Sequence, residues 1–334
     1  MGAGGSRFKS GCPDFLLMTT AFHINSFFNR HAADGFSSVV SADGIHAFLC
    51  ESFVTPFPFK SLLVSVQHTL RPGAVLLLEA QVRVRNVWSG FYKLGMFSAD
   101  FKRSFPAQED SFGTVATDEL QLFSAADAYR VRIHYKGDAT LQGVGVCGVR
   151  EPFLYDEKVA SRLPQGTHQV AVEPISQMEQ THPDRRRICS PTSLCMALNA
   201  LGISVSLEEV MRGVFDQTAN IYGNWIFNTA YANEMGAEAC IRRFSSLEQL
   251  KDFVTENSYV LASIAFEENE LPGAPLSHTS GHFVVVRGWE NHQILVADPA
   301  APTAQTVCRA YGREEFARAW LKRKQGISYI VRKK

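Results

Sequence analysis

Residues 280–299, SGHFVVVRGWENHQILVADP, decide how the C-terminal part of the chain folds. Two apolar runs, 282–288 and 294–298, flank a turn-like sequence at 290–292, and this pattern predicts a β-hairpin. If the hairpin is centred near Glu290, paired residues have numbers that sum to 580, as 282 and 298 do. His282 and Asp298 would then lie opposite each other, with Cβ atoms about 5 Å apart. A carboxylate so placed can orient an imidazole, although a slip of one residue in register would turn it away.

A cysteine stands where a loop is expected to become a helix. Cys189 follows three arginines at 185–187 and opens an apolar pattern with helical spacing over 190–200. The positive end of a helix dipole and the free N–H groups there favour the reactive thiolate. Free cysteines are also common as small buried hydrophobic residues, and Cys195 in the middle of the same helix fits that role better. Cys189, His282 and Asp298 are therefore the candidate catalytic residues.

Two further roles need assignment from the sequence. His278 and His292 lie in loops near the hairpin and are alternatives to His282 as the base. Acyl transfer also needs hydrogen-bond donors for the developing oxyanion, and a side-chain amide upstream of the nucleophile can supply one. Gln177 and Gln180 both fit, and spacing does not choose between them.

The segment around the cysteine resembles a known family. Residues 188–194, ICSPTSL, look like the Cys-Gly-Pro-Thr-Ser nucleophile segment of the bacteriocin-processing (double-glycine) leader peptidase-like family, a branch of the papain-like cysteine peptidases. Residues 281–288 and 296–299 are similar to its His and Asp segments. Residues 222–231 and 270–275 resemble stand-alone bacterial members. The resemblance covers residues 170–331.

The resemblance implies a fold, a site and an activity. It implies a papain-like domain whose triad is Cys189, His282 and Asp298, with Gln177 completing the oxyanion hole, and neither a metal nor an organic cofactor. Ser190 stands where the family more often has Gly. The loop between Gln177 and Cys189 is longer than in the transporter enzymes, which bears on the glutamine assignment.

The remaining patterns predict an α+β chain in two parts. Strict alternation of polar and apolar residues over 79–85 and 129–136 predicts antiparallel strands, so we expect an antiparallel β-sandwich, jelly-roll-like, over 44–155. An N-terminal extension over 1–43 precedes it and a linker over 156–168 follows it. In the peptidase domain, 169–334, we expect helices at 190–200, 206–214, 226–235 and 246–255. Strands are expected at 259–266, 282–288, 294–298 and 327–331.

Composition bears on partners and location. Lys and Arg number 33 and so do Asp and Glu, so no overall field favours nucleic acid. No apolar run is long enough for a transmembrane segment and no signal peptide is visible, so we expect a cytoplasmic protein, with a secreted or cell-surface protein as the alternative. The seven cysteines lack the spacing of a disulfide framework. In the sandwich, Trp88 and Tyr92 either pack in the core or stack on a glycan, cell-wall or peptide ligand.

These patterns together predict thiol-dependent hydrolysis of a peptide or amide bond in a peptide or protein substrate. Two alternatives stay open. One is an acyltransferase that uses the same triad. The other is an inactive binding protein whose sandwich recognises a glycan or peptide.

Overall fold

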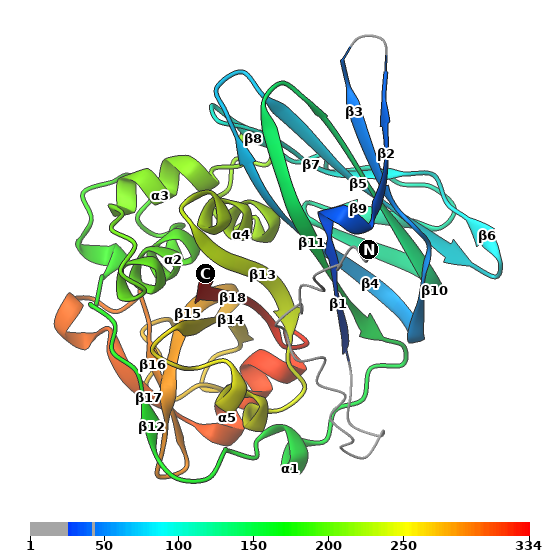
Figure 1. Cartoon of the computed structure of the whole chain (residues 1–334). Helices are drawn as coiled ribbons and strands as arrows, with labels where there is room; N and C mark the ends of the chain where they lie inside the picture. Colours follow the sequence, from blue (N-terminus) through cyan, green and yellow to red (C-terminus); the bar gives the residue numbers. More distant parts are fainter. Residues whose placement is uncertain (1–25, 42–43) are drawn as a thin grey trace, which may run out of the picture.

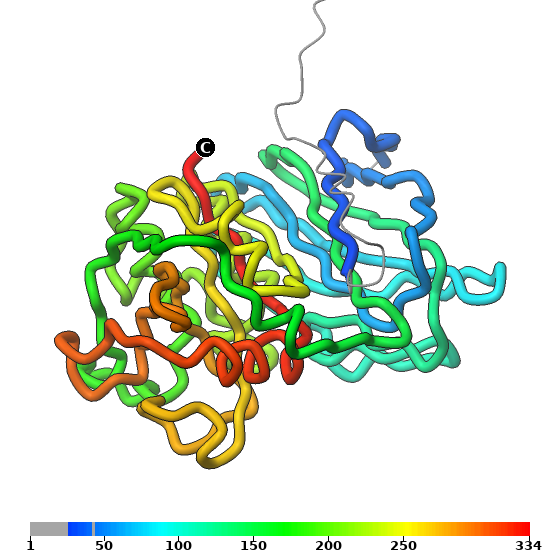
Figure 2. Tube along the Cα trace, turned by 90° about the horizontal axis from the view of Figure 1, so that it is seen from below, coloured from blue at the N-terminus to red at the C-terminus, as the bar shows by residue number. Residues whose placement is uncertain are grey.

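The computed structural model describes residues 26–41 and 44–334. Its strands form two antiparallel sheets, one in each half of the chain (Figure 1). Figure 2 shows the two halves as lobes that lie side by side, with the N-terminal strands in one and the later strands in the other. None of the described helices is long and apolar enough to span a bilayer.

The N-terminal sheet has the order β1-β11-β4-β10-β5-β7-β8, with β2, β3, β6 and β9 paired at its sides. The predicted alternation is confirmed, since Val131 and Ile133 are fully buried while Arg130 and Arg132 are partly exposed. The elements are β1 (Ser26–Ala32), a 3-10 turn η1 (Ala33–Gly35), β2 (Phe36–Val40), β3 (His46–Cys50), β4 (Phe53–Leu70), β5 (Val75–Val84), β6 (Val87–Trp88), β7 (Tyr92–Ser98), β8 (Lys102–Arg103), β9 (Gly113–Ala116), β10 (Glu119–Lys136) and β11 (Ala139–Arg150).

Antiparallel pairing is as expected, but a sandwich of two sheets is not confirmed. The 18-residue strand β10 pairs with β9 and β4 along its first half and with β5 and β3 along its second half. Register shifts between Gln121 and Ala128 separate these two halves. Because one strand serves both parts, the hydrogen bonding continues through a single sheet.

The sheet also begins earlier than residue 44. Strands β1 and β2 lie within the range expected as an extension, and they pair with β11 and β3. The sequence of β1, SFFNRHA, has no strict alternation, which is why its pattern did not indicate a strand. Residues 1–25 of the expected extension lie outside the described residues.

Of the two aromatic residues singled out in this part, Tyr92 packs in the core with 4% of its surface exposed. Trp88 is partly exposed, and the guanidinium of Arg130 lies over its ring, 4.1 Å from the centroid. Tyr92 is therefore not available to stack on a ligand.

The C-terminal lobe has the expected α+β order, with helices first and an antiparallel sheet β13-β18-β14-β15-β16-β17 afterwards. Ser206 caps α3 through a capping box with Glu209. The elements are α1 (Glu157–Ala160), β12 (His168–Gln169), η2 (Gln177–Glu179), α2 (Cys189–Ala200), α3 (Leu207–Val214), α4 (Trp225–Glu234), β13 (Ala237–Arg243), η3 (Leu247–Asp252), β14 (Ser258–Phe266), β15 (Thr279–Glu290), β16 (Gln293–Ala297), η4 (Ala304–Thr306), β17 (Cys308–Gly312), α5 (Arg313–Ala317), the π-helical η5 (Arg318–Lys322) and β18 (Ile327–Lys333).

The helix predicted at 246–255 is wrong in type and length, because η3 is a six-residue 3-10 helix. The chain after η3 leads directly into β14, and Thr255 and Ser258 form a β-bridge where this strand begins. Little room is left for an α-helix.

Helix α4 joins the two lobes by packing on β4 and β7. The rings of Phe97 on β7 and Phe227 on α4 meet edge to face, with centroids 5.2 Å apart. Charged groups are buried around this contact. The Lys102 ammonium lies 3.0 Å from Glu234, and the Arg243 guanidinium bonds with Glu119 and Ser61. The lobes are therefore held by both apolar and ionic contacts.

Candidate active site

The thiol of Cys189 lies at the first residue of α2, as predicted, and is partly exposed. The His282 side chain and the backbone N–H groups of Phe283 and Ser190 lie where they interact with its sulfur. Burial acts to raise the pKa of this thiol, but the His282 side chain and the two N–H groups outweigh it, so the pKa lies below its usual value. These surroundings thus favour the thiolate more than those of a free cysteine do.

His282 and Asp298 meet directly. The Nε2 atom of His282 lies 2.7 Å from Oδ1 of Asp298, and the two residues are only 2% and 1% exposed. Burial acts to lower the pKa of His282, but Asp298 and Cys189 outweigh it and raise the pKa. Burial likewise opposes ionisation of Asp298, yet His282 and Tyr311 keep the pKa of that carboxyl below its usual range. Since Nε2 is bonded to Asp298, Nδ1 is the ring nitrogen left for the sulfur.

The hairpin register predicted from the sequence is wrong, although the predicted contact is present. Near the turn Gly288 pairs with Leu295, but farther along Val285 pairs with Ala297, because Arg287 is bulged out between them. If the register at the turn continued, Asp298 would face Val285. The bulge shifts it by one residue, which puts Asp298 on the same face as Val284 and His282. The two side chains then meet diagonally.

Tyr311 on β17 is a part of the site that the sequence did not reveal. Its hydroxyl donates to Oδ2 of Asp298 at 2.6 Å, while the N–H of Ala300 donates to Oδ1 at 2.9 Å. Tyr311 is almost fully buried. The carboxylate is thereby fixed from both sides, which orients the imidazole.

Ser190, where the family more often has Gly, fits this site without an unpaired hydroxyl. The hydroxyl donates to Asn228 Oδ1 at 2.9 Å and lies 3.0 Å from the Tyr329 hydroxyl. Asn228 in turn donates to the carbonyl oxygens of Tyr222 and Asn224. These partners come from α4 and β18, so the start of α2 is tied to both elements.

Comparison with known proteins identifies the domain that carries this arrangement. Residues 169–328 match the model of the Peptidase_C39 like family. This part of the chain belongs to that family. A comparison with curated proteins found no match.

Two solved structures are similar to the Peptidase_C39-like domain. One is a double glycine motif protease from an AMS/PCAT transporter in complex with the leader peptide, with 21% identity, 52% of this chain and 97% of that chain covered, and a TM-score of 0.35. The other is a C39-like peptidase from Bacillus anthracis, with 18% identity, 51% of this chain and 98% of that chain covered, and a TM-score of 0.38.

Of the two glutamines, Gln177 has the more suitable surroundings in the Peptidase_C39-like domain. It begins η2, its N–H donates to the carbonyl of Pro299 beside Asp298, and its side-chain oxygen is buried without a hydrogen-bond partner. Gln180 already uses its amide to bond the carbonyl of Ser176. Gln177 therefore lies next to the acid of the site with part of its amide unused.

The alternative histidines lie elsewhere. His278 is exposed and hydrogen-bonds with Ser277, and His292 is exposed in the hairpin turn. Among the described residues, His282 is the histidine that interacts with Cys189.

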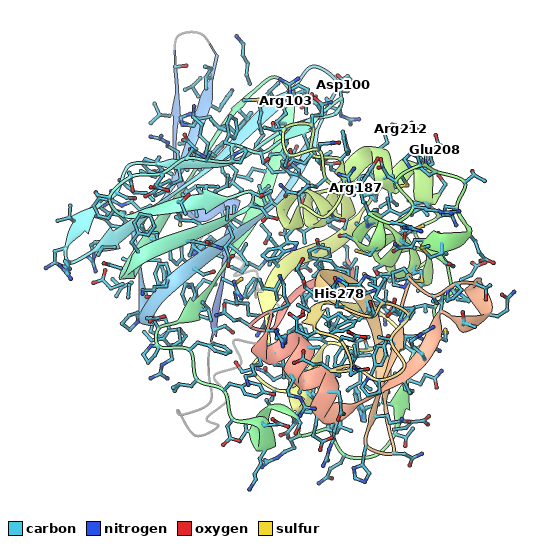
Figure 3. The ribbon with its side chains drawn as sticks, turned by 180° about the vertical axis from the view of Figure 1, so that it is seen from behind. Asp100, Arg103, Arg187, Glu208, Arg212 and His278 are labelled. Atoms are coloured by element: carbon cyan, nitrogen blue, oxygen red, sulfur yellow. The ribbon has the colours of Figure 1, made fainter. Side chains whose placement is uncertain are left out.

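A cavity of about 490 Å³ opens between the lobes near the loop that leads to Cys189. Gln180 and His182 of this loop form one wall, Met211 of α3 another, and Asp100 and Phe101 of the N-terminal lobe a third. Figure 3 shows Asp100 and Arg103 beside Arg212 and Glu208 on this side of the molecule. Cys189 does not line this cavity.

Proposed function

We propose that the chain is a cysteine peptidase that hydrolyses a peptide or amide bond in a peptide substrate. The observation that carries this proposal is the arrangement of Cys189 at a helix N-terminus, His282 interacting with its thiol, and Asp298 hydrogen-bonded to that histidine. The raised pKa of His282 and the lowered pKa of Cys189 both favour a thiolate–imidazolium pair. Membership of the Peptidase_C39 like family supports the same reaction class.

In the proposed reaction the Cys189 thiolate attacks the carbonyl carbon, and the carbonyl electrons move onto its oxygen. The imidazolium of His282 then donates its proton to the leaving amine, and an acyl-enzyme forms. Next, His282 takes a proton from water, the hydroxide attacks the acyl group, and the thiolate leaves. Asp298 holds the ring throughout, with Nε2 toward the carboxylate and Nδ1 toward the sulfur.

The oxyanion would be held by the backbone N–H of Cys189 and by the Gln177 amide. The first N–H groups of a helix have no partner within it, so that of Cys189 is available. Pro191, in the same first turn of α2, has no N–H group, so no hydrogen-bond donor is left without a partner at that position. Gln177 would donate to the oxyanion through its side-chain NH2 group, while its buried side-chain oxygen has no hydrogen-bond partner.

The test is covalent labelling by a thiol-directed peptidyl probe together with cleavage of a peptide library. Cys189→Ala should abolish both, whereas Cys308→Ala, at an exposed free cysteine, should change neither. Labelling at full strength in Cys189→Ala would refute the nucleophile. Product analysis with added amine distinguishes hydrolysis from acyl transfer, and labelling without any cleavage would favour the inactive binding protein.

We also propose that residues 26–155 and 169–334 are two structural units joined by the segment 156–168. Short α1, capped by Asp156, interrupts this segment, and Arg318 pairs with Glu157 in it. Most residues of the segment are nevertheless exposed or partly exposed, so limited proteolysis should cut first within 156–168. Early cuts inside either sheet would argue against this division.

A further inference from the structure

One basic side chain beside the candidate active site has no acidic partner. The Lys324 ammonium donates to the carbonyl of Ser280 at 3.4 Å and lies over the ring of Trp225, 5.7 Å from its centroid. It forms no ion pair with any residue of 26–41 or 44–334. An ammonium has three donors, so two are unused here.

This ammonium lies beside the strand that carries His282. Lys324 Nζ is 3.9 Å from the position that a Cβ on Gly281 would take, and Gly281 precedes His282. The backbone N–H of Phe283, two residues further along the same strand, is one of the groups that interact with the Cys189 sulfur. Since a strand rises about 3.3 Å per residue, sulfur and ammonium are on the order of 10 Å apart. That is the reach of a side chain one or two residues from the reacting carbonyl.

The surroundings of Lys324 are partly shielded and partly acidic. Burial lowers its pKa, and Glu119 and Asp118 of the N-terminal lobe oppose this. These carboxylates are engaged elsewhere, since Glu119 bonds with Arg243 and Asp118 accepts the N–H of Trp225. Lys324, Trp225 and Gly281 are all at least partly exposed. A ligand can therefore reach the ammonium.

We propose that Lys324 and Trp225 form a subsite for an acidic side chain of the peptide substrate, one or two residues from the scissile bond. The unused donors of Lys324 bind the carboxylate, and the indole of Trp225 provides an apolar wall for the methylene groups of the same side chain. Water and salt screen the charge of a partly buried ammonium less than that of an exposed one. Its attraction for a carboxylate is therefore stronger than its attraction for a neutral amide. This subsite rests on the proposed peptidase function and adds a substrate preference to it.

The test uses two pairs of peptidyl vinyl sulfones that differ only in Glu against Gln, at the first or second residue from the reactive group. The rate of Cys189 labelling is measured in a Cys308→Ser background, with the modified residue identified by mass spectrometry. At one position the Glu probe should label about tenfold faster than the Gln probe, as a charge-assisted bond predicts. High salt should reduce this ratio.

Variants of Lys324 separate the outcomes. Lys324→Met should bring the ratio close to one while the Gln probe still labels, and Lys324→Arg should retain part of the preference. Lys322→Met is the matched control, because Lys322 is exposed and lies over Tyr155. It should keep the full ratio. A ratio near one at both positions in the unaltered protein, or a tenfold ratio that survives in Lys324→Met, overturns the subsite alone. Absence of labelling by every probe contradicts the peptidase function, and the subsite is then refuted with it.

Discussion

Gly288→Ala should disturb the hairpin that brings His282 and Asp298 together. Gly288 follows the bulged Arg287 and has φ +150°, a backbone conformation that residues other than glycine rarely adopt. A Cβ there would lie 1.9 Å from the carbonyl oxygen of His168 on β12. The substitution therefore acts on both the bulge and the strand that covers it.

The size of the effect follows from these contacts. Real Cβ atoms essentially never approach other atoms below 3.0 Å, so the backbone of His168 must move by at least 1.1 Å, the difference between 3.0 and 1.9 Å. The backbone strain costs about 1–3 kcal/mol. Displacing β12 also weakens the Val170 N–H bond to the Arg287 carbonyl, 2.7 Å long, which is worth about 1 kcal/mol. We expect the free energy of unfolding to fall by about 2–4 kcal/mol.

The assay is urea unfolding combined with the rate of Cys189 labelling by a peptidyl probe. Gly273→Ala is the matched control, because Gly273 has φ +81° but no atom within 4 Å of the added Cβ. It should cost only about 1–2 kcal/mol and leave labelling unchanged. Gly288→Ala should lower both the stability and the labelling rate. If the two variants were equal in stability and in labelling rate, the reasoning about the bulge would be refuted.

Two further predictions concern the acid of the site. Tyr311→Phe removes a hydroxyl that donates to a carboxylate, so it should lower the free energy of unfolding by about 1.5–3 kcal/mol. The control Tyr259→Phe removes a hydrogen bond to a backbone carbonyl and should lower it by about 0.5–1.5 kcal/mol, and equal losses in urea unfolding would contradict this. Asp298→Ala should move the alkaline limb of Cys189 labelling to lower pH. Asp298 raises the pKa of His282, so in its absence the imidazolium loses its proton at lower pH. If the alkaline limb of the labelling rate did not move, Asp298 would not stabilise the imidazolium.

Features that depend on neighbouring residues could be predicted from the sequence. The start of α2 at Cys189 is set by a proline in its first turn, and the start of α3 by the Ser206–Glu209 capping box. Strands β5 and β10 follow from alternation of apolar and polar residues. Each of these signals lies within a few residues of the element that it defines.

Features that depend on distant contacts could not be predicted. The bulge at Arg287 is fixed by β12, whose backbone comes so close that only glycine fits at 288. The predicted register was therefore wrong. His282 and Asp298 are nevertheless in contact, because the observed register still places both side chains on the same face of the hairpin. Tyr311 reaches Asp298 from β17, a strand that no pattern indicated. Such partners are set by tertiary packing.

The contacts between the lobes indicate that the N-terminal sheet supports the site. Asp118, in the turn just before β10, accepts the N–H of Trp225, the first residue of α4. One turn later Asn228 holds Ser190 beside Cys189. Arg243, only 3% exposed, has its ionic partner Glu119 on the other lobe. Separating the lobes would leave that arginine without its carboxylate and the α4 N-terminus without its acceptor, so the contacts that hold β13 and α4 in place would be lost. The position of the nucleophile therefore depends on residues from both halves of the chain.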